Sequence, residues 1–322
     1  MRKIFFALAL LAGLALASAP ILPRDYQRRL GVGMDADWGK TPRSMHRYRR
    51  TEAEAFRALG FDHLRFRVRQ DATPEVLDHL ERLVKDALAL GFTPVIAYKA
   101  EEFKVDPTPE NRDRAVAWWR AVAERFQDYP PELAFELVIE PSDRVNREPE
   151  KLLELYQRAL AEIRKTNPTR IIFVSPRVRS APEYLHELDP LFEGDPFLMA
   201  EWHFYASGPS KKNPKKRWTT GTPEEKRLIL DKINHALAWQ RRTGHYTWVG
   251  EWMPGNYNKG NTYSVPEQVA FATFVSCALR KAGIPFAVNQ ANKFYDEEAG
   301  RLREEMRPVL EAILRPRCEG ER

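Results

Sequence analysis

The sequence predicts a single (β/α)8 barrel, and three observations support this fold class. Short apolar stretches with the character of strands alternate with amphipathic helical stretches along nearly the whole chain, which is typical of parallel β-sheet. Eight such units fit within the 322 residues, as expected for a barrel. No Gly-x-Gly-x-x-Gly or phosphate-loop pattern follows the first strand, so an open nucleotide-binding sheet has little support.

The N-terminal segment lies outside the predicted barrel. Two basic residues precede an apolar run and the small-residue site Ala17-Ser18-Ala19, which together predict an export signal over residues 1–19. Residues 20–322 then form one barrel domain, and we expect a secreted or periplasmic monomer that does not bind membranes after signal removal. Pro20 directly after this site is unfavourable for cleavage, so a cut after Ala17 is an alternative. A retained N-terminal anchor also stays open.

The predicted strands are short runs rich in aromatic and β-branched residues. They cover residues 30–34, 63–69, 93–98, 134–140, 170–174, 197–205, 247–253 and 285–289. The second strand alternates basic and apolar side chains, so Arg65 and Arg67 share one side of it. Glu140 and Glu251 each follow an apolar run, which places both carboxylates at strand ends.

Helical stretches separate these strands. They cover residues 50–59, 74–90, 110–126, 149–166, 223–242, 265–282 and 297–314. Gly60, Gly91 and Gly244 stop three of them, as glycine often does at a helix C-terminus. Trp118 and Trp119 lie on the third helix at a spacing typical of core packing.

Charge and cysteine content argue against two classes of protein. The net charge is +6, but the 51 basic residues are interspersed with 45 acidic ones, which is typical of a solvated surface and not of a nucleic-acid partner. The basic run at residues 211–217 has no accompanying recognition motif and is interpreted as a solvated loop. Cys277 and Cys318 are the only cysteines, so a disulfide framework is not implied.

The residues at strand C-termini line one mouth of such a barrel, where catalysis occurs. The predicted mouth collects Arg65, Tyr98, Lys99, Glu140, His203, Tyr205, Glu251 and Asn289. Two carboxylates among these groups suit glycoside hydrolysis, which needs one carboxylic acid to protonate the leaving oxygen and one carboxylate to attack or to activate water.

Four segments in chain order resemble family 5 glycoside hydrolases of clan A, the cellulase-like enzymes. They are WWRAVAERF at residues 118–126, FELVIEP at 135–141, HFY at 203–205 and VGEW at 249–252. The resemblance implies a retaining enzyme that cuts β-1,4-glucan or a related plant polysaccharide internally and needs no cofactor or metal.

The resemblance also implies roles for individual residues. Glu140 matches the acid/base and Glu251 the nucleophile. Arg65 matches an arginine that supports the nucleophile, and His203 and Tyr205 match the histidine and tyrosine of strand six.

Three positions depart from the family pattern. Ile139 stands where the family has an asparagine that contacts the sugar 2-hydroxyl, Lys99 lies where a histidine is expected, and Asn289 lies near the position of the tryptophan platform. An alternative hypothesis is therefore a carbohydrate-binding protein on a degenerate hydrolase barrel.

Several further residues have competing interpretations. Glu201 shares a strand face with His203, so it is a substrate contact or a rival catalytic carboxylate. Lys99 either lowers the pKa of a nearby carboxyl or extends its ammonium group to solvent. Asp35 and Asp37 form the one close acidic pair near a mouth, but no metal-ligand spacing accompanies them. Aromatic residues that are candidates for stacking on sugar are Trp38, Trp202, Trp218, Trp252 and Tyr257.

Overall fold

Eight strands pair in chain order and close into a barrel in the computed structural model, which describes residues 19–205, 216–255 and 263–320. Every neighbouring pair in the barrel is parallel, including the closing pair of β1 and β8, so all strand C-termini face one mouth. The strands are β1 (Val32–Ala36), β2 (His63–Val68), β3 (Thr93–Tyr98), β4 (Ala134–Glu136), β5 (Ile172–Val174), β6 (Leu198–His203), β7 (Thr247–Trp252) and β8 (Phe286–Val288). The predicted (β/α)8 barrel is confirmed.

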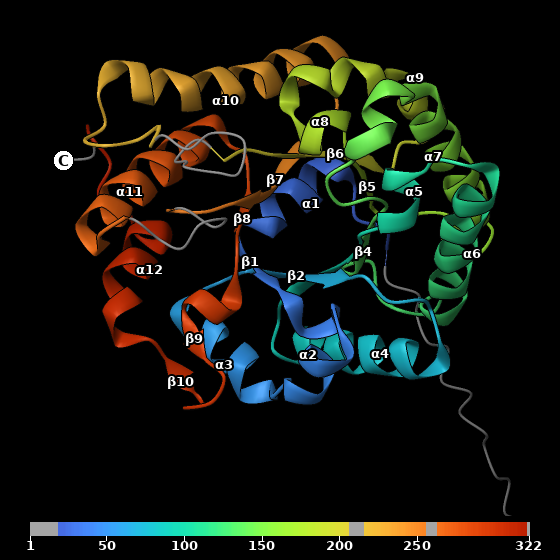
Figure 1. The fold of residues 1–322 in the computed structure, drawn as a ribbon, viewed down its shortest axis with the longest axis horizontal. Coiled ribbons are helices and arrows are strands. Elements are labelled where there is room, and N and C mark those ends of the chain that lie inside the picture. Colours follow the sequence, from blue (N-terminus) through green and yellow to red (C-terminus); the bar gives the residue numbers. More distant parts are fainter. Residues whose placement is uncertain (1–18, 206–215, 256–262, 321–322) are drawn as a thin grey trace, which may run out of the picture.

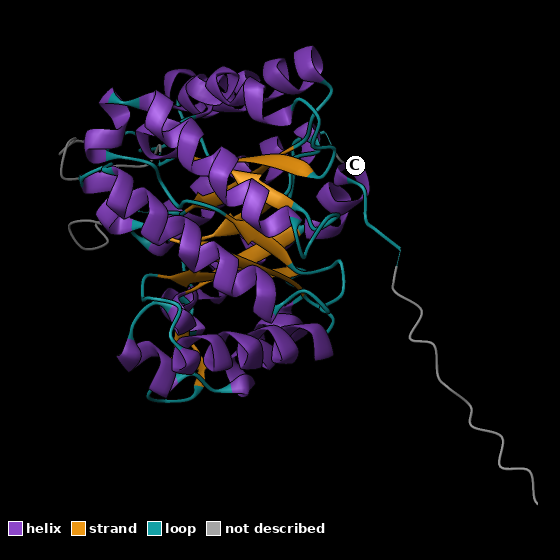
Figure 2. Ribbon diagram, turned by 90° about the vertical axis from the view of Figure 1, so that its right-hand side faces the viewer, coloured by secondary structure: helices purple, strands orange, loops and turns teal. Residues whose placement is uncertain are grey.

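Helices surround the strands on all sides (Figures 1 and 2). They are α1 (Pro23–Leu30), α2 (Pro42–Arg47), α3 (Arg50–Leu59), α4 (Pro74–Ala89), α5 (Glu101–Val105), α6 (Pro109–Arg125), α7 (Pro149–Arg164), α8 (Arg177–Ser180), α9 (Asp189–Phe192), α10 (Pro223–Thr243), α11 (Val265–Ala282) and α12 (Arg307–Leu314). Short 3-10 turns, η1 (Asp37–Gly39), η2 (Asp143–Arg147), η3 (Pro182–Leu188), η4 (Ala291–Lys293) and η5 (Glu304–Met306), lie in the connections.

Capping residues in the sequence mark the starts of the long helices. Thr73, Thr108 and Thr222 each accept a hydrogen bond from a backbone N–H in the first turn of α4, α6 and α10, and a proline follows each of them. At the other end of α10, Gly244 adopts the left-handed conformation that ends a helix. These local signals explain why the predicted helix boundaries agree with the structure to within about two residues.

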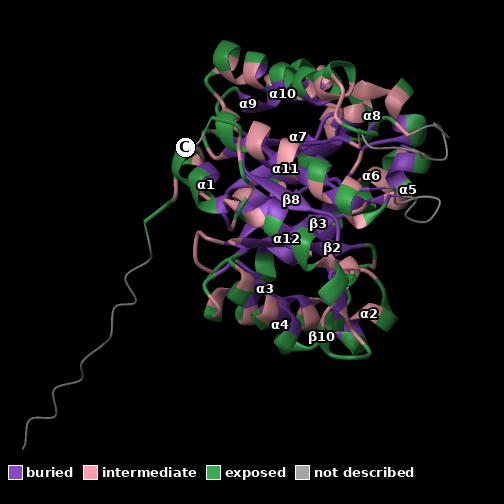
Figure 3. Cartoon of the chain, turned by 90° about the vertical axis from the view of Figure 1, so that its left-hand side faces the viewer, coloured by how far each residue is buried: buried purple, intermediate pink, exposed green. Residues whose placement is uncertain are grey.

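The core has two parts. A large cluster fills the space between strands and outer helices, and a smaller one lies inside the barrel. The inner cluster includes Tyr26 and Leu30 of α1, which lies across the barrel in Figure 1 and closes the end opposite the mouth. Burial follows the same plan, with the strands buried and the outer helix faces exposed (Figure 3). The sequence reading did not predict α1.

The C-terminal region also differs from the prediction, in its secondary structure and in its disulfide. The helix expected over residues 297–314 is replaced in its first part by the end of a two-stranded hairpin, β9 (Tyr295–Asp296) with β10 (Arg301–Leu302). Only η5 and α12 at the end of this range are helical. Cys277 of α11 and Cys318 beyond α12 form a disulfide. This bridge was not predicted, because the two positions are 41 residues apart and only the packing of α12 on α11 brings them together.

The predicted export signal and the basic run at 211–217, apart from its last two residues, lie outside the described residues. Among the residues that are described, no helix has the length and apolarity needed to cross a membrane.

Candidate active site

The mouth of the barrel holds a buried network of charged side chains contributed by most of its strands. Strand β2 supplies two of them because its alternation directs Arg65 and Arg67 into the barrel, while Phe66 and Val68 pack outward. The network members are Asp35, Asp37, Arg65, Arg67, Lys99, Glu136, Glu140, Glu201, His203 and Glu251, with Tyr205 and Asn289 beside them.

Glu251 is held by cations on one oxygen and by neutral donors on the other. Its Oε2 lies 3.2 Å from Nη1 of Arg65 and 3.2 Å from Nη1 of Arg67, while Oε1 accepts hydrogen bonds from the Tyr205 hydroxyl and the Asn289 amide. Burial alone would raise the pKa of this carboxyl, but Arg67, His203 and Arg65 hold the pKa well below its usual range. Glu251 is therefore an ionised, oriented carboxylate, as a nucleophile requires.

Glu140 lies just beyond β4, with its backbone in the left-handed region at φ 52°. Its Oε2 lies 4.0 Å from Nζ of Lys99 and 3.8 Å from Nη1 of Arg179, and its Oε1 lies 3.5 Å from Nδ1 of His203. Burial would raise the pKa of Glu140, but His203 and Lys99 lower it to about 2 in the resting site.

His203 lies between the two glutamates. Its Nδ1 is 3.9 Å from Oε2 of Glu251, and one carboxylate oxygen of each glutamate and a ring nitrogen all lie within 4.8 Å of one another. Burial alone would lower the pKa of His203, but Glu201, Glu140 and Glu251 raise it to about 10. An imidazolium at this position lets two ionised carboxylates lie close together.

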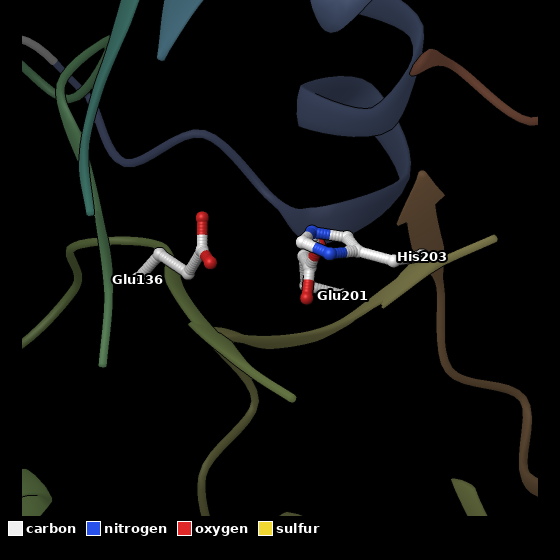
Figure 4. A group of neighbouring side chains, drawn as sticks. All are labelled: Glu136, Glu201 and His203. Carbon is white, nitrogen blue, oxygen red and sulfur yellow. Dashed lines mark ion pairs between the residues drawn. The ribbon is translucent and has the colours of Figure 1, made fainter. Parts of the chain in front are cut away.

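A second layer of charges lies beneath the mouth. Arg65 has no solvent exposure and donates two hydrogen bonds of 2.6 Å to the two carboxylate oxygens of Glu136, and a third to Asp35 at 3.1 Å. Figure 4 shows Glu136, Glu201 and His203 gathered beside the barrel interior. Arg65 already binds Glu136 and Asp35, while Ser175 and His203 contact Glu201. Arg67 and Lys40 likewise bind Asp37 at 2.7 and 2.9 Å. The donor set therefore suits an ion-pair network better than a metal site.

Two of the predicted substrate contacts are wrong. Tyr98 is 2% exposed and stacks on Trp118 at 4.1 Å between β3 and α6, so it faces the helices and not the mouth. Trp252 is fully buried against Phe271 and Phe286. A register shift between Val249 and Trp252 places this ring on the helix side of β7, while Glu251 faces the mouth. The other tryptophan candidates for sugar stacking, Trp38, Trp202 and Trp218, are also buried, and Tyr257 lies outside the described residues.

The positions of two further residues, both predicted as substrate contacts, also differ from the prediction. Arg65 and Glu201 have no solvent exposure, so both lie beneath the surface of the mouth, where a direct substrate contact does not fit. Lys99, His203, Tyr205 and Asn289 do lie around the glutamates as predicted.

Several residues of the network were not predicted as site residues. Asp35 and Glu136 bind Arg65. Both lie on strands, and the alternation of side chains along each strand would have predicted that they face the barrel interior. Arg179 comes from the loop after β5, where Val178, Arg179 and Ser180 all have positive φ. No sequence pattern predicts this conformation. It is stabilised in part by a backbone hydrogen bond from the Arg179 N–H to the Pro141 carbonyl at 2.8 Å, which joins two separate loops.

A parallel barrel with two close glutamates at its C-terminal mouth is the architecture of a glycoside hydrolase. Residues 30–292 match the family model described as Cellulase (glycosyl hydrolase family 5), and the chain belongs to this family. The resemblance noted in the sequence is thereby confirmed.

Individual relatives are more distant. Endoglucanase H from Acetivibrio thermocellus is 23% identical over 318 residues, which covers 91% of this chain but only 34% of that protein, so the chain spans about a third of this relative's length. Similar solved structures include a hyperthermophilic endo-beta-1,4-glucanase in complex with substrate (23% identity, TM-score 0.78, 91% of this chain and 99% of that one). Endoglucanase Cel5A from Thermotoga maritima is similar too (22%, TM-score 0.76, 91% and 100%). At these identities the structures show a shared fold.

Proposed function

We propose that this protein is an endo-acting glycoside hydrolase that cleaves β-1,4-glucan or a related plant polysaccharide with retention of configuration. The observation that carries the proposal is the pair of glutamates at the mouth, with carboxylate oxygens within 4.8 Å of each other. Retaining enzymes hold their two carboxyl groups ~5–5.5 Å apart, whereas inverting enzymes need ~6.5–9.5 Å to admit a water molecule. The endoglucanase names of the relatives support the choice of glucan.

In the proposed double displacement, Glu251 attacks the anomeric carbon while Glu140 protonates the leaving oxygen. Arg65 and Arg67 keep Glu251 ionised, and the hydrogen bonds from Tyr205 and Asn289 fix its orientation. Water then attacks the glycosyl-enzyme with Glu140 as the base.

The test is the activity of Glu140→Gln and Glu251→Gln on carboxymethyl cellulose, mannan, xylan and mixed-linkage glucan. Each change is expected to lower kcat by ~10²-fold or more, because general acid–base catalysis alone contributes ~10²–10⁴-fold. Glu110→Gln is the matched control, since that glutamate is 85% exposed on α6 and far from the network. Undiminished activity in either site variant would remove that residue from the mechanism, and NMR of the first-formed anomer tests retention.

A second candidate is a carbohydrate-binding protein on a hydrolase barrel that has lost turnover. Ile139 favours it, because this buried apolar side chain stands where the family has an amide for the sugar 2-hydroxyl. Calorimetric binding of cello-oligosaccharides without hydrolysis at high protein concentration would support this candidate over the first.

Export is a separate proposal. It rests on the signal-like residues 1–19 and is supported by the Cys277–Cys318 disulfide, since disulfides persist mainly in oxidising compartments. Cell fractionation with N-terminal sequencing tests it: we expect a chain outside the cytoplasm that begins after Ala17 or Ala19, and an intact N-terminus would contradict cleavage.

A further inference from the structure

Glu201 is a fully buried carboxylate that the proposed double displacement does not use. It lies two residues before His203 on β6, so both side chains point into the barrel, and its Oε1 contacts Nε2 of His203 (Figure 4). Its other oxygen, Oε2, accepts a 2.7 Å hydrogen bond from the Ser175 hydroxyl at the end of β5. A substrate in the mouth reaches His203 before it reaches Glu201.

The neighbouring strand is built to make room for this carboxylate. A Cβ at Gly250 on β7 would lie 2.0 Å from Oε1 of Glu201, a separation that atoms do not tolerate. Gly250 directly precedes Glu251, so the same strand that presents the proposed nucleophile also leaves space for the Glu201 side chain. Ser175 and Gly250 therefore fix the carboxylate from two sides.

The opposite nitrogen of the ring faces the proposed catalytic pair. Nδ1 of His203 is 3.5 Å from Glu140 and 3.9 Å from Glu251. The other charged groups around the ring are Arg65, whose Nη2 lies 3.4 Å from Nε2, and Glu136, whose carboxylate is grouped with it beneath the mouth. Asp35 acts on the ring at longer range. Carboxylates thus outnumber cations around this imidazole.

We propose that Glu201 is a positioning residue that retains one proton in the His203–Glu140 pair, so that Glu140 has a proton to donate at neutral and alkaline pH. The proposal rests on the proposed function, in which Glu140 is the acid/base. In this role Glu201 does not contact the substrate and does not replace Glu140 or Glu251 as a catalytic carboxylate.

The proton moves within the pair as the first step proceeds. When Glu251 bonds to the anomeric carbon, its negative charge is consumed, and His203 loses one of the anions that hold its proton. The Nδ1 proton then passes to Glu140 and on to the leaving oxygen, which keeps the electron pair of the broken glycosidic bond. In the second step the attacking water bonds to the anomeric carbon, the bond to Glu251 breaks, and the water proton returns through Glu140 to His203.

This shared proton reconciles two properties of the resting site. The pKa of Glu140 is about 2, so this carboxyl alone is ionised at neutral pH, whereas the pKa of His203 is about 10. Between these values Glu140 stays ionised and His203 keeps its proton, so the two groups together hold one proton that can be transferred. The charge of Glu201 is the first of the neighbouring influences that raise the pKa of His203.

The experiment compares the full-length protein with Glu201→Gln, which removes the charge, and Ser175→Ala, which removes the hydrogen bond but keeps the charge. The pH profile of kcat/KM is measured on a cello-oligosaccharide. Loss of the charge is expected to shift the alkaline limb downward by one pH unit or more, which lowers activity about twofold or more at pH 9 and ~10-fold at pH values above both limbs, while Ser175→Ala leaves the limb in place. An unshifted limb in an active Glu201→Gln protein would overturn the proposal.

A second measurement does not depend on turnover. Imidazole NMR, with the His203 signal assigned from His203→Asn, follows the ring protonation directly. The ring is expected to stay protonated at pH 8 in the unmodified protein and to lose its proton at a pH at least one unit lower in Glu201→Gln than in the unmodified protein. A neutral His203 at pH 8 in the unmodified protein overturns the proposal without any Glu201 variant. If the protein hydrolyses no glycan but the NMR result is as expected, the proposed function fails and the role of Glu201 stands.

Discussion

At the residue scale, Arg65 shows how tightly the buried charges of this protein depend on one another. It binds Asp35, Glu136 and Glu251 at once without any solvent exposure. Removing one member of such a network leaves an unpaired buried charge, which costs ~3–5 kcal/mol. Variants that alter a partner of Arg65 therefore need a stability measurement beside any activity measurement.

Glu52 on α3 is a buried carboxyl that does not belong to the charged network at the mouth, and it carries a prediction of its own. Burial raises its pKa to about 8, with the charge of Glu297 acting in the same direction. Because the folded pKa exceeds the unfolded value of 4.5, stability is fully present below pH 4.5 and is lost as the pH rises through about 8. Glu52→Gln is therefore expected to be more stable than the parent above pH 8, by about 3 kcal/mol, and equal to it near pH 4.

Urea unfolding at pH 4 and pH 9 measures this difference. The control is Glu54→Gln on the same helix, whose side chain is 47% exposed and pairs with Arg50 on the surface. Equal effects of the two changes at pH 9 would contradict the prediction.

Gly250 carries a second prediction at this scale. Gly250→Ala is expected to destabilise the fold by ~2 kcal/mol or more, because the new methyl group collides with Glu201. Gly39→Ala is the control, since the nearest atom to its added Cβ is a Leu80 methyl at 3.3 Å. Combining Gly250→Ala with Glu201→Ala should recover part of the loss in a double-mutant cycle followed by urea unfolding. Strict additivity would show that the collision is not the cause.

At the element scale, the loops after β3, β4 and β5 carry the unusual backbone of this barrel. Among the described residues, the non-glycine positions with positive φ all lie in these three loops: Ala100, Glu140, Asp143, Val178, Arg179 and Ser180. Such conformations cost ~1–3 kcal/mol each and persist where the surrounding structure enforces them, commonly at functional sites. The loops hold Glu140 and Arg179 over the mouth, so the strain lies where the proposed chemistry needs fixed geometry.

The disulfide between α11 and the segment after α12 carries the prediction at the element scale. It closes a loop of 41 residues that includes β8, the β9–β10 hairpin and α12. In the chain-entropy description, a crosslink of this length stabilises the fold by about 4 kcal/mol. The double change Cys277→Ser and Cys318→Ser should lower the Tm by several degrees, and a reductant should lower the Tm of the parent but not of the variant. A parent Tm that is insensitive to reductant would contradict this prediction.

At the scale of the whole molecule, the buried charges set a pH window of stability. The pKa of Glu140 is lowered to about 2 and that of Glu251 is lowered further, so their contribution is present above about pH 4.5 and is lost as the pH falls toward 2. The pKa of His203 is raised to about 10, so its contribution is full below pH 6.5 and is lost as the pH rises through 10. The pKa of Asp35 is raised from 3.8 to about 7, so its contribution is full below pH 3.8 and is lost as the pH rises through 7.

Stability is therefore expected to be greatest between about pH 4.5 and pH 6.5. Urea unfolding at pH 3, 5.5 and 9 tests this window. Glu140→Gln should lose less stability than the parent between pH 5.5 and pH 3, by on the order of 2 kcal/mol, because it has no depressed carboxyl to protonate there. A stability maximum above pH 8 would contradict the assignment of these charges.

The sequence by itself determined the order of strands and helices, the direction of Arg65 and Arg67 into the barrel, and the placement of Glu140 and Glu251 beside one mouth. These features follow from periodicity, helix caps and the closure of a parallel barrel, which are local or general properties. Neighbouring strand residues point to opposite faces, so the sequence also places Trp252 opposite Glu251, as the structure confirms. The prediction that Trp252 contacts substrate conflicted with this alternation and is wrong.

Only the tertiary structure decided which charged groups touch. The binding of Glu136 to Arg65, the contact of Glu201 with His203 and the approach of Arg179 to Glu140 each join residues of different elements or depend on the exact pleat of one. The Cys277–Cys318 bridge and the closure of the barrel by α1 depend on the packing of distant segments in the same way. The physical reason is that a sequence pattern reports which side a residue faces, whereas ion pairs and loop conformations depend on atoms that the complete fold brings within a few ångströms.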